Sequence, residues 1–160
     1  MTTRTNETTI EAVDGLPIVR IVREFDAPPA KVFRAHTDPD LLRQWFGPRT
    51  TEMRIDDWDC RTGGTYAYAH QTEHGEFAVR GCFHDVVPSV VIVQTFGFPG
   101  QPESAVLERY TFDDLGDGRT RLTLSTLAES FETRDAIIAS GMEYGVREGY
   151  QRLDELLPTL

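Results

Sequence analysis

The stretch GMEYGVREGYQRLDELL, residues 141–157, carries three glycines spaced four residues apart. Each glycine inside a helix costs ~1 kcal/mol relative to alanine, because the unfolded chain loses more freedom when it orders. Apolar residues recur around them at helical spacing, from Ile138 to Leu156. We therefore expect one long helix over residues 130–157, with an apolar face that must cover a large apolar surface.

Gly141, Gly145 and Gly149 lie on one flank of that apolar face. One explanation is close packing, because a helix surface without side chains can approach bulky residues directly. The other is vacancy, in which the missing side chains leave room for a ligand. A membrane dimer motif is excluded, since charged Glu143 and Arg147 interleave with the glycines. Spacing alone favours packing over vacancy by roughly two to one, since interiors are normally close-packed.

The surface to be covered is a predicted antiparallel sheet. Residues 17–25, PIVRIVREF, form a β-branched run, and six further runs follow after Thr50. Two short helices that open with proline, at residues 29–37 and 38–46, separate the first run from the rest. Short turn signals between consecutive runs favour an antiparallel meander of seven strands. The six later runs are TEMRIDDW, GTYAYAH, EFAVRGCFHDVV, SVVIVQTF, AVLERYTF and TRLTLSTL.

These elements predict a single α+β domain over residues 17–160, after a polar tail at residues 1–16. We expect that tail to be flexible, with at most a short strand near residues 10–13. Hydrophobic residues make up 39% of the 160 and charged residues 26%, as in ordinary globular proteins. The net charge of −10 and the lack of a basic cluster predict no nucleic-acid partner. No secretory or membrane-spanning pattern is present, so we expect a cytoplasmic protein without membrane insertion.

The hairpin of the second and third of these runs places aromatic residues on one face. With His74-Gly75 as a two-residue turn, Tyr66 lies opposite Phe83 and Tyr68 opposite Gly81. We expect this aromatic face to be the one that the helix covers. Tyrosine hydroxyls need polar partners, which a wholly dry core would not offer. The other face is expected to carry Arg80, Cys82 and His84.

Four stretches carry a family resemblance. They are REFDAPPAKVFRAHTDPDLLRQWFGP (23–48), DCRTGG (59–64), GCFHDV (81–86) and SGMEYGVREGYQRLDELL (140–157). With these motifs the chain resembles the START-like (SRPBCC) superfamily, in the branch named for the activator of heat-shock-protein-90 ATPase. The resemblance implies a helix-grip fold, in which a strongly curved seven-stranded antiparallel sheet wraps around the C-terminal helix. It also implies a cavity between them, which answers the glycine question in favour of vacancy.

Fold does not fix function, and this superfamily includes lipid and polyketide carriers, aromatase/cyclases, drug-sequestering proteins and a co-chaperone domain. Our first hypothesis is a protein that binds a small hydrophobic or aromatic molecule, without a cofactor or metal. Residues 45–48 are expected at the mouth of its pocket. The residues expected to line or rim the pocket are Trp45, Phe46, Tyr66, Tyr68, Phe83, Phe96, Ile138, Met142, Gly145 and Gly149.

A second hypothesis is an enzyme acting on a polyketide-type substrate, such as a cyclase or hydrolase. It needs an inward acid or base, for which Glu108 and His70 are the candidates, because no catalytic triad or metal motif occurs. An ordinary role for Glu108, at a partly exposed strand edge or paired with a neighbouring strand, is favoured by roughly three to one, because structural ion pairs are commoner than catalytic ones. His36 is expected at the surface or at a helix end.

A third hypothesis is a protein-interaction module like the co-chaperone. The co-chaperone has a separate domain ahead of this fold, whereas only about 17 residues precede it here, which argues against this hypothesis. A homodimer through a sheet edge or loop is left open. Cys60 and Cys82 are expected to be buried, reduced thiols, with a disulfide between them as the alternative.

Overall fold

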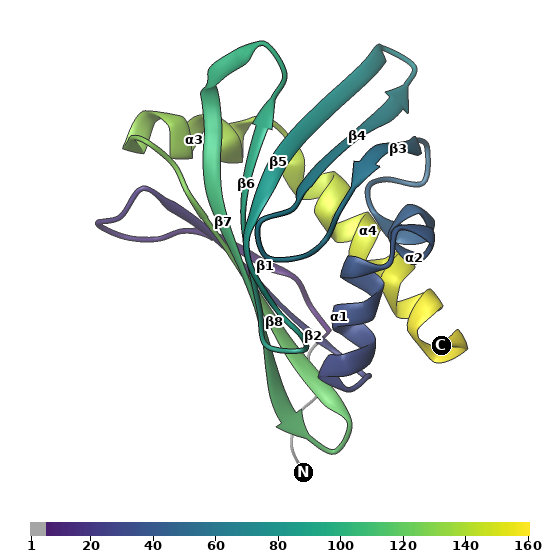
Figure 1. The fold of residues 1–160 in the computed structure, drawn as a ribbon. Coiled ribbons are helices and arrows are strands. Elements are labelled where there is room, and N and C mark those ends of the chain that lie inside the picture. The colour runs from purple at the N-terminus through teal and green to yellow at the C-terminus, as the bar shows by residue number, and fades with distance from the viewer. Residues whose placement is uncertain (1–5) are drawn as a thin grey trace.

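The computed structural model describes residues 6–160, which form one curved antiparallel sheet with helices on its concave side (Figure 1). The strand order across the sheet is β1-β2-β8-β7-β6-β5-β4-β3. The elements are β1 (Thr9–Ala12), β2 (Ile18–Phe25), α1 (Pro29–Thr37), α2 (Pro39–Trp45), β3 (Glu52–Trp58), β4 (Thr65–Thr72), β5 (Gly75–Val87), β6 (Val91–Phe98), β7 (Gln101–Gly116), β8 (Arg119–Leu127), α3 (Phe131–Ala139), α4 (Met142–Leu156) and a 3₁₀ turn at Leu157–Thr159.

The sheet has eight strands within the described residues, so the prediction of seven was wrong. The additional strand is β1, which pairs antiparallel with β2 and places Thr9 opposite Val22. A short strand near this point was expected as an option within the tail. Residues 1–5 of the expected tail lie outside the described residues. The backbone groups of β1 pair with the free edge of β2, which would otherwise be exposed.

The register of the β4–β5 hairpin differs from the prediction by two residues. Tyr66 lies opposite Gly81 and Tyr68 opposite Val79, with Glu73-His74 as the turn. The Thr72 hydroxyl fixes this turn, because it accepts from the His74 N–H at 3.1 Å and donates to the Gly75 carbonyl at 2.8 Å. Since the shift is an even number, the predicted faces survive, and the tyrosines still point to the concave side.

Gly81 is required by this register. A Cβ atom there would lie 2.6 Å from ring carbons of Tyr66 and 2.0 Å from the carbonyl oxygen of Thr95. The Tyr66 ring thus lies across the glycine on the neighbouring strand, and any side chain would displace it. The pair fixes one aromatic wall of the concave face.

The predicted single helix over residues 130–157 is two helices, α3 and α4. Ser130 caps α3 as expected, with its hydroxyl accepting from the Thr133 N–H at 3.1 Å. The chain then breaks at Gly141, whose φ of +84° is a left-handed conformation that glycine adopts without strain. Apolar periodicity does not report such a break, because it continues on both sides of it.

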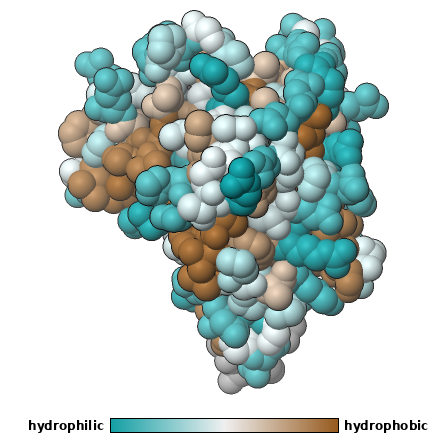
Figure 2. Space-filling view, in the orientation of Figure 1, coloured by the Kyte–Doolittle hydropathy of each residue, from teal (hydrophilic) through white to brown (hydrophobic). Residues whose placement is uncertain are grey.

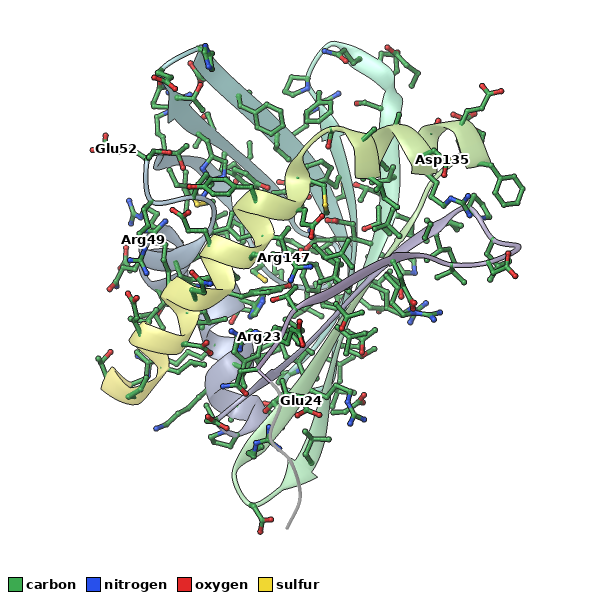
Figure 3. The ribbon with its side chains drawn as sticks, turned by 180° about the vertical axis from the view of Figure 1, so that it is seen from behind. Arg23, Glu24, Arg49, Glu52, Asp135 and Arg147 are labelled. Carbon is green, nitrogen blue, oxygen red and sulfur yellow. The ribbon has the colours of Figure 1, made fainter. Side chains whose placement is uncertain are left out.

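Helix α4 runs diagonally over the concave face and is tied down by arginines (Figure 3). Arg23 of β2 is buried and pairs with Asp154 of α4, with a nitrogen–oxygen distance of 2.6 Å. Arg49, which follows α2, donates to Glu155. Arg147 donates from α4 to the Thr8 carbonyl. The helix is therefore held to the sheet edge on one side and to the α2 loop on the other.

Apolar side chains also gather at the surface, over the β1–β2 hairpin and below α3 (Figure 2). Leu16, Leu127 and Phe131 are all exposed in this region. Arg134 of α3 stacks over the Phe131 ring and donates to the Val13 and Leu16 carbonyls. No helix of residues 6–160 has both the length and the apolar character needed to span a membrane.

Candidate functional site

A cavity of about 540 Å³ lies between the concave face of the sheet and helices α3 and α4. Nine of the ten predicted pocket residues line it, and Ile138 does not. Ile137 lines it instead, because the break at Gly141 rotates α3 out of the phase extrapolated from α4. The nine are Trp45, Phe46, Tyr66, Tyr68, Phe83, Phe96, Met142, Gly145 and Gly149.

The two ends of the cavity differ in exposure. At one end Trp45 and His36 are buried, and the Trp45 indole N–H donates to the Ala35 carbonyl at 2.9 Å. At the other end Phe77 is 47% exposed, and Ala136 and Ser140 of the α3 segment are also exposed. The mouth therefore lies between α3 and the β4–β5 hairpin. The expectation of a mouth at residues 45–48 was wrong for Trp45, because α1 and α2 cover that end.

The two glycines inside α4 differ in how closely the chain packs against them. A Cβ atom on Gly149 would lie 3.2 Å from the Trp45 carbonyl oxygen and the Gly47 nitrogen. A Cβ atom on Gly145 would lie 3.4 Å from the Pro48 ring. Gly149 therefore lets α4 approach the loop after α2, as the packing explanation expects, whereas Gly145 makes only an ordinary contact there and both glycines line the cavity.

Glu108 of β7 points into the cavity and is 8% exposed. The Gln94 amide of β6 donates to its carboxylate at 3.0 Å, and the Thr126 side chain of β8 also hydrogen-bonds to it. Burial raises the pKa of Glu108 to about 7, against the lowering effect of these two donors. Glu108 is therefore not at an exposed strand edge, and its pairing with the neighbouring strands is through these two hydrogen bonds, without an ion pair among residues 6–160.

Four tyrosines line the same cavity and lie near enough to Glu108 for its charge to act on them. Burial raises the pKa of each, and the nearby charge of Glu108 raises it further; they are Tyr66, Tyr68, Tyr110 and Tyr150. The Tyr66 hydroxyl donates to the Thr95 carbonyl at 2.6 Å and accepts from Gln94 at 3.3 Å. The expectation that tyrosine hydroxyls on this face find polar partners is confirmed for Tyr66.

Two histidines also line the cavity. His36 is buried among aromatic rings, 4.8 Å from the Trp45 ring centroid and 5.7 Å from that of Tyr110, so its predicted surface position was wrong. Its Nδ1 lies 2.7 Å from the Val32 carbonyl oxygen, and burial lowers its pKa to about 4. The Nε2 atom of His36 and the Nδ1 atom of His70 are buried without a hydrogen-bond partner in residues 6–160.

Sequence reasoning missed several lining residues, among them Gln94, Val106, Tyr110 and Tyr150. The strand residues among these could have been predicted from the sequence, because every second residue of a strand points to the same face. Once Glu108 is taken as inward, Val106 and Tyr110 follow on β7. Gln94 then follows from the β6–β7 register, which places it opposite Glu108.

The two cysteines and His84 do not line the cavity. Cys60 and Cys82 are both free, and Cys82 is exposed, so its predicted burial was wrong. Burial raises the pKa of the Cys60 thiol to about 11. His84 is exposed, as expected. Within residues 6–160, no three His, Cys, Asp or Glu side chains gather in a way that could hold a metal ion.

A curved antiparallel sheet, a C-terminal helix over its concave face and a cavity between them define a protein of the START-like, helix-grip class (Figure 1). The family model of Activator of Hsp90 ATPase homolog 1-like protein matches residues 26–158, and the chain belongs to that family.

Solved structures agree with this fold. A protein from Mycobacterium smegmatis is 24% identical with a TM-score of 0.86, over 94% of this chain and 97% of that one. A protein from Rhodobacter sphaeroides is 23% identical with a TM-score of 0.86, over 96% of this chain and 100% of that one. A protein from Chromobacterium violaceum is 26% identical with a TM-score of 0.74, over 87% of this chain and 96% of that one. No curated protein matches the chain.

Proposed function

We propose that this protein binds a small hydrophobic or aromatic molecule in the cavity between the sheet and helices α3 and α4. The cavity itself carries the proposal. Protein interiors are normally close-packed, whereas this one encloses about 540 Å³. Ligand pockets typically hold roughly 300–1,000 Å³ and are lined by apolar and aromatic groups with a few polar ones. The lining of this cavity has that composition.

The first experiment is native mass spectrometry of freshly purified protein, compared with the same sample after denaturation. An additional mass that is lost on denaturation identifies a bound molecule directly. In parallel, purified protein is titrated with N-phenyl-1-naphthylamine, a neutral dye whose fluorescence rises in apolar surroundings. We expect saturable binding of one dye molecule per chain.

A matched pair of variants locates the dye. Val106 lines the cavity and is 8% exposed, whereas Val90 lies in the β5–β6 turn and is 55% exposed. Val106→Trp fills the cavity and should weaken dye binding at least tenfold, while Val90→Trp should leave it unchanged. Ala136→Trp, at the exposed mouth, provides a second obstruction in case Val106→Trp does not fold. Equal binding by all these proteins would contradict the proposal.

Glu108 favours a second candidate function, that of an enzyme with a carboxyl acid or base. Its pKa of about 7 lies in the range where a carboxyl group can exchange protons at neutral pH. A carboxylate in an apolar cavity is also a stronger base than one in water. These properties fit proton transfer to or from a bound substrate.

Kemp elimination of 5-nitrobenzisoxazole tests this capacity. A base removes the ring C–H proton while the N–O bond breaks, and the phenolate product is followed by absorbance. If Glu108 acts as the base, turnover should rise with pH through about 7 and disappear in Glu108→Gln. Turnover at the buffer rate, with the probe shown to bind, would remove this candidate.

A further inference from the structure

We propose that the molecule held in this cavity is a hydrophobic amine, with its ammonium group at Glu108 and its apolar part against the aromatic walls. This inference rests on the proposed function and names the chemical class of its ligand. It starts from the sign of the charges around the cavity. Among the described residues, Glu108 is the only acidic group in the lining, and no lysine or arginine lines it.

An anionic ligand is disfavoured by this lining. A fatty acid or a phosphorylated lipid would bring a second negative charge beside Glu108 without a cation to balance it. Two carboxylates sharing one site cannot both ionise without strong repulsion. Two arginines whose charges reach lining residues are engaged elsewhere: Arg23 pairs with Asp154, and Arg152 donates to the Gly47 and Gln44 carbonyls.

Glu108 has acceptor capacity left for a ligand. A carboxylate offers about four acceptor positions, and the structure shows donors from Gln94 and Thr126. These two donors hold the group in place without neutralising it. An ammonium group supplies up to three further donors and the missing positive charge, which makes its hydrogen bonds charge-assisted.

The histidine at the closed end adds a second acceptor. Because the Nδ1 of His36 faces the Val32 carbonyl oxygen at 2.7 Å, the proton of the neutral ring lies on Nδ1. Its Nε2, buried and without a partner in residues 6–160, is then a bare acceptor in the cavity lining. His36 contacts Tyr110, which in turn lies near Glu108. The Glu108 carboxylate and the Nε2 atom of His36 thus both favour a ligand that donates hydrogen bonds.

The aromatic walls favour a cation as well. Tyr66 and Tyr68 of β4, Tyr110 of β7 and Tyr150 of α4 lie close enough to Glu108 to sense its charge. The faces of aromatic rings attract cations, most strongly in sites with little water. The net charge of −10 also raises the local concentration of cations around the protein.

Three probes with one skeleton test the inference by calorimetry: 2-(1-naphthyl)ethylamine, 2-(1-naphthyl)ethanol and 1-naphthaleneacetic acid. In the wild-type protein the amine should bind at least tenfold more tightly than the alcohol, and the acid most weakly. In Glu108→Gln the ratio of amine to alcohol affinity should fall to near one, with circular dichroism confirming the fold. Glu52→Gln removes an equal charge from the exposed surface and should keep the wild-type ratio.

The amine preference should also depend on pH. The groups facing Glu108 are the four tyrosines, Gln94, Thr126 and, beyond Tyr110, neutral His36. Among these groups Glu108 is the one that titrates near neutral pH; His70 also lines the cavity, and burial lowers its pKa from the ordinary 6.5. An alkylamine stays protonated below about pH 9. Amine binding should weaken at least tenfold from about pH 8 to about pH 5.5, while alcohol binding changes little.

The outcomes separate the two proposals. Alcohol or acid binding as tight as that of the amine would overturn the amine assignment and leave the binding function standing. An amine preference that survives in Glu108→Gln would also overturn it. If none of the three probes and no N-phenyl-1-naphthylamine binds the wild-type protein, both proposals fail together.

Discussion

The Gln94 amide nitrogen lies 3.0 Å from a carboxylate oxygen of Glu108, across the neighbouring strands β6 and β7. The same amide reaches the Tyr66 hydroxyl at 3.3 Å, and so links Glu108 to the aromatic wall on β4. This contact holds a carboxyl group at a fixed place in an otherwise apolar cavity without giving it a countercharge. Buried charges are ordinarily paired, so an unpaired one facing a cavity marks a candidate site.

Glu108 should make the folded protein less stable as pH rises. Its pKa is raised from 4.5 to about 7 in the folded state, so folded protein holds more protons than unfolded protein between those values. The free energy of unfolding should therefore fall by roughly 1.4 kcal/mol per pH unit in this window. Glu108→Gln should remove this contribution, so that the variant gains stability relative to wild type from pH 4.5 to pH 7. Urea denaturation across this range measures it, and a constant difference between the two proteins would contradict it.

His36 should have the opposite effect on stability, making the folded protein more stable as pH rises. Its pKa is lowered from 6.5 to about 4, so the unfolded chain binds the extra proton between these values. The stability that the neutral ring contributes is complete above pH 6.5. As pH falls from there toward 4, the free energy of unfolding should fall by roughly 1.4 kcal/mol per pH unit. In His36→Phe this acid-side loss should disappear, whatever the absolute stability of the variant. The measured quantity is again the pH slope from urea denaturation, and an unchanged slope would show that His36 is not the group responsible.

Two glycines of one helix should respond differently to alanine. Gly149→Ala places a methyl group 3.2 Å from backbone atoms of Trp45 and Gly47, which cannot move without shifting α2, and should destabilise by about 1–3 kcal/mol. Gly145→Ala meets only the edge of Pro48, at 3.4 Å, and gains up to ~1 kcal/mol of helix propensity. The second variant should therefore be neutral or more stable. Thermal unfolding of both distinguishes them, and equal shifts would contradict the packing difference.

The Arg23–Asp154 ion pair should contribute more to stability than the exposed Arg49–Glu155 ion pair, which also involves α4. The Arg23 side chain is 3% exposed, so Asp154→Ala leaves a buried charge without its partner. We expect a loss of roughly 2–4 kcal/mol, a range that takes account of the partial exposure of Asp154. Glu155→Ala removes the exposed partner of Arg49 and should have little effect. Chemical denaturation of the two variants makes the comparison, and similar losses would refute it.

Much of the fold was readable from the sequence, because it depends on local periodicity and turn chemistry. Alternating runs gave seven strands in the right order, and proline and aspartate marked the two short helices. The aromatic face of the β4–β5 hairpin was also right, even though its register was not. Side chains alternate with a period of two, so an even error in register does not change the faces.

The site was predicted in part, where a residue's place followed from the pattern of its own element. Trp45, Tyr66 and Met142 line the cavity as predicted, while Ile138 does not. The break at Gly141 decides that difference, and nothing in the spacing of apolar residues reports it. The family resemblance indicated a cavity correctly, and Gly145 and Gly149 of α4 line it.

The sequence by itself determined the order of α1, α2 and strands β2 to β8, the sheet faces and the family. Only the tertiary structure decided which polar groups stand alone in the cavity. Whether Glu108 meets a countercharge depends on the strands that the sheet brings beside it. Whether His36 is exposed depends on how α1 packs against the sheet and α2. Burial and pairing arise from contacts between segments far apart in the chain, and these set the chemistry of the cavity.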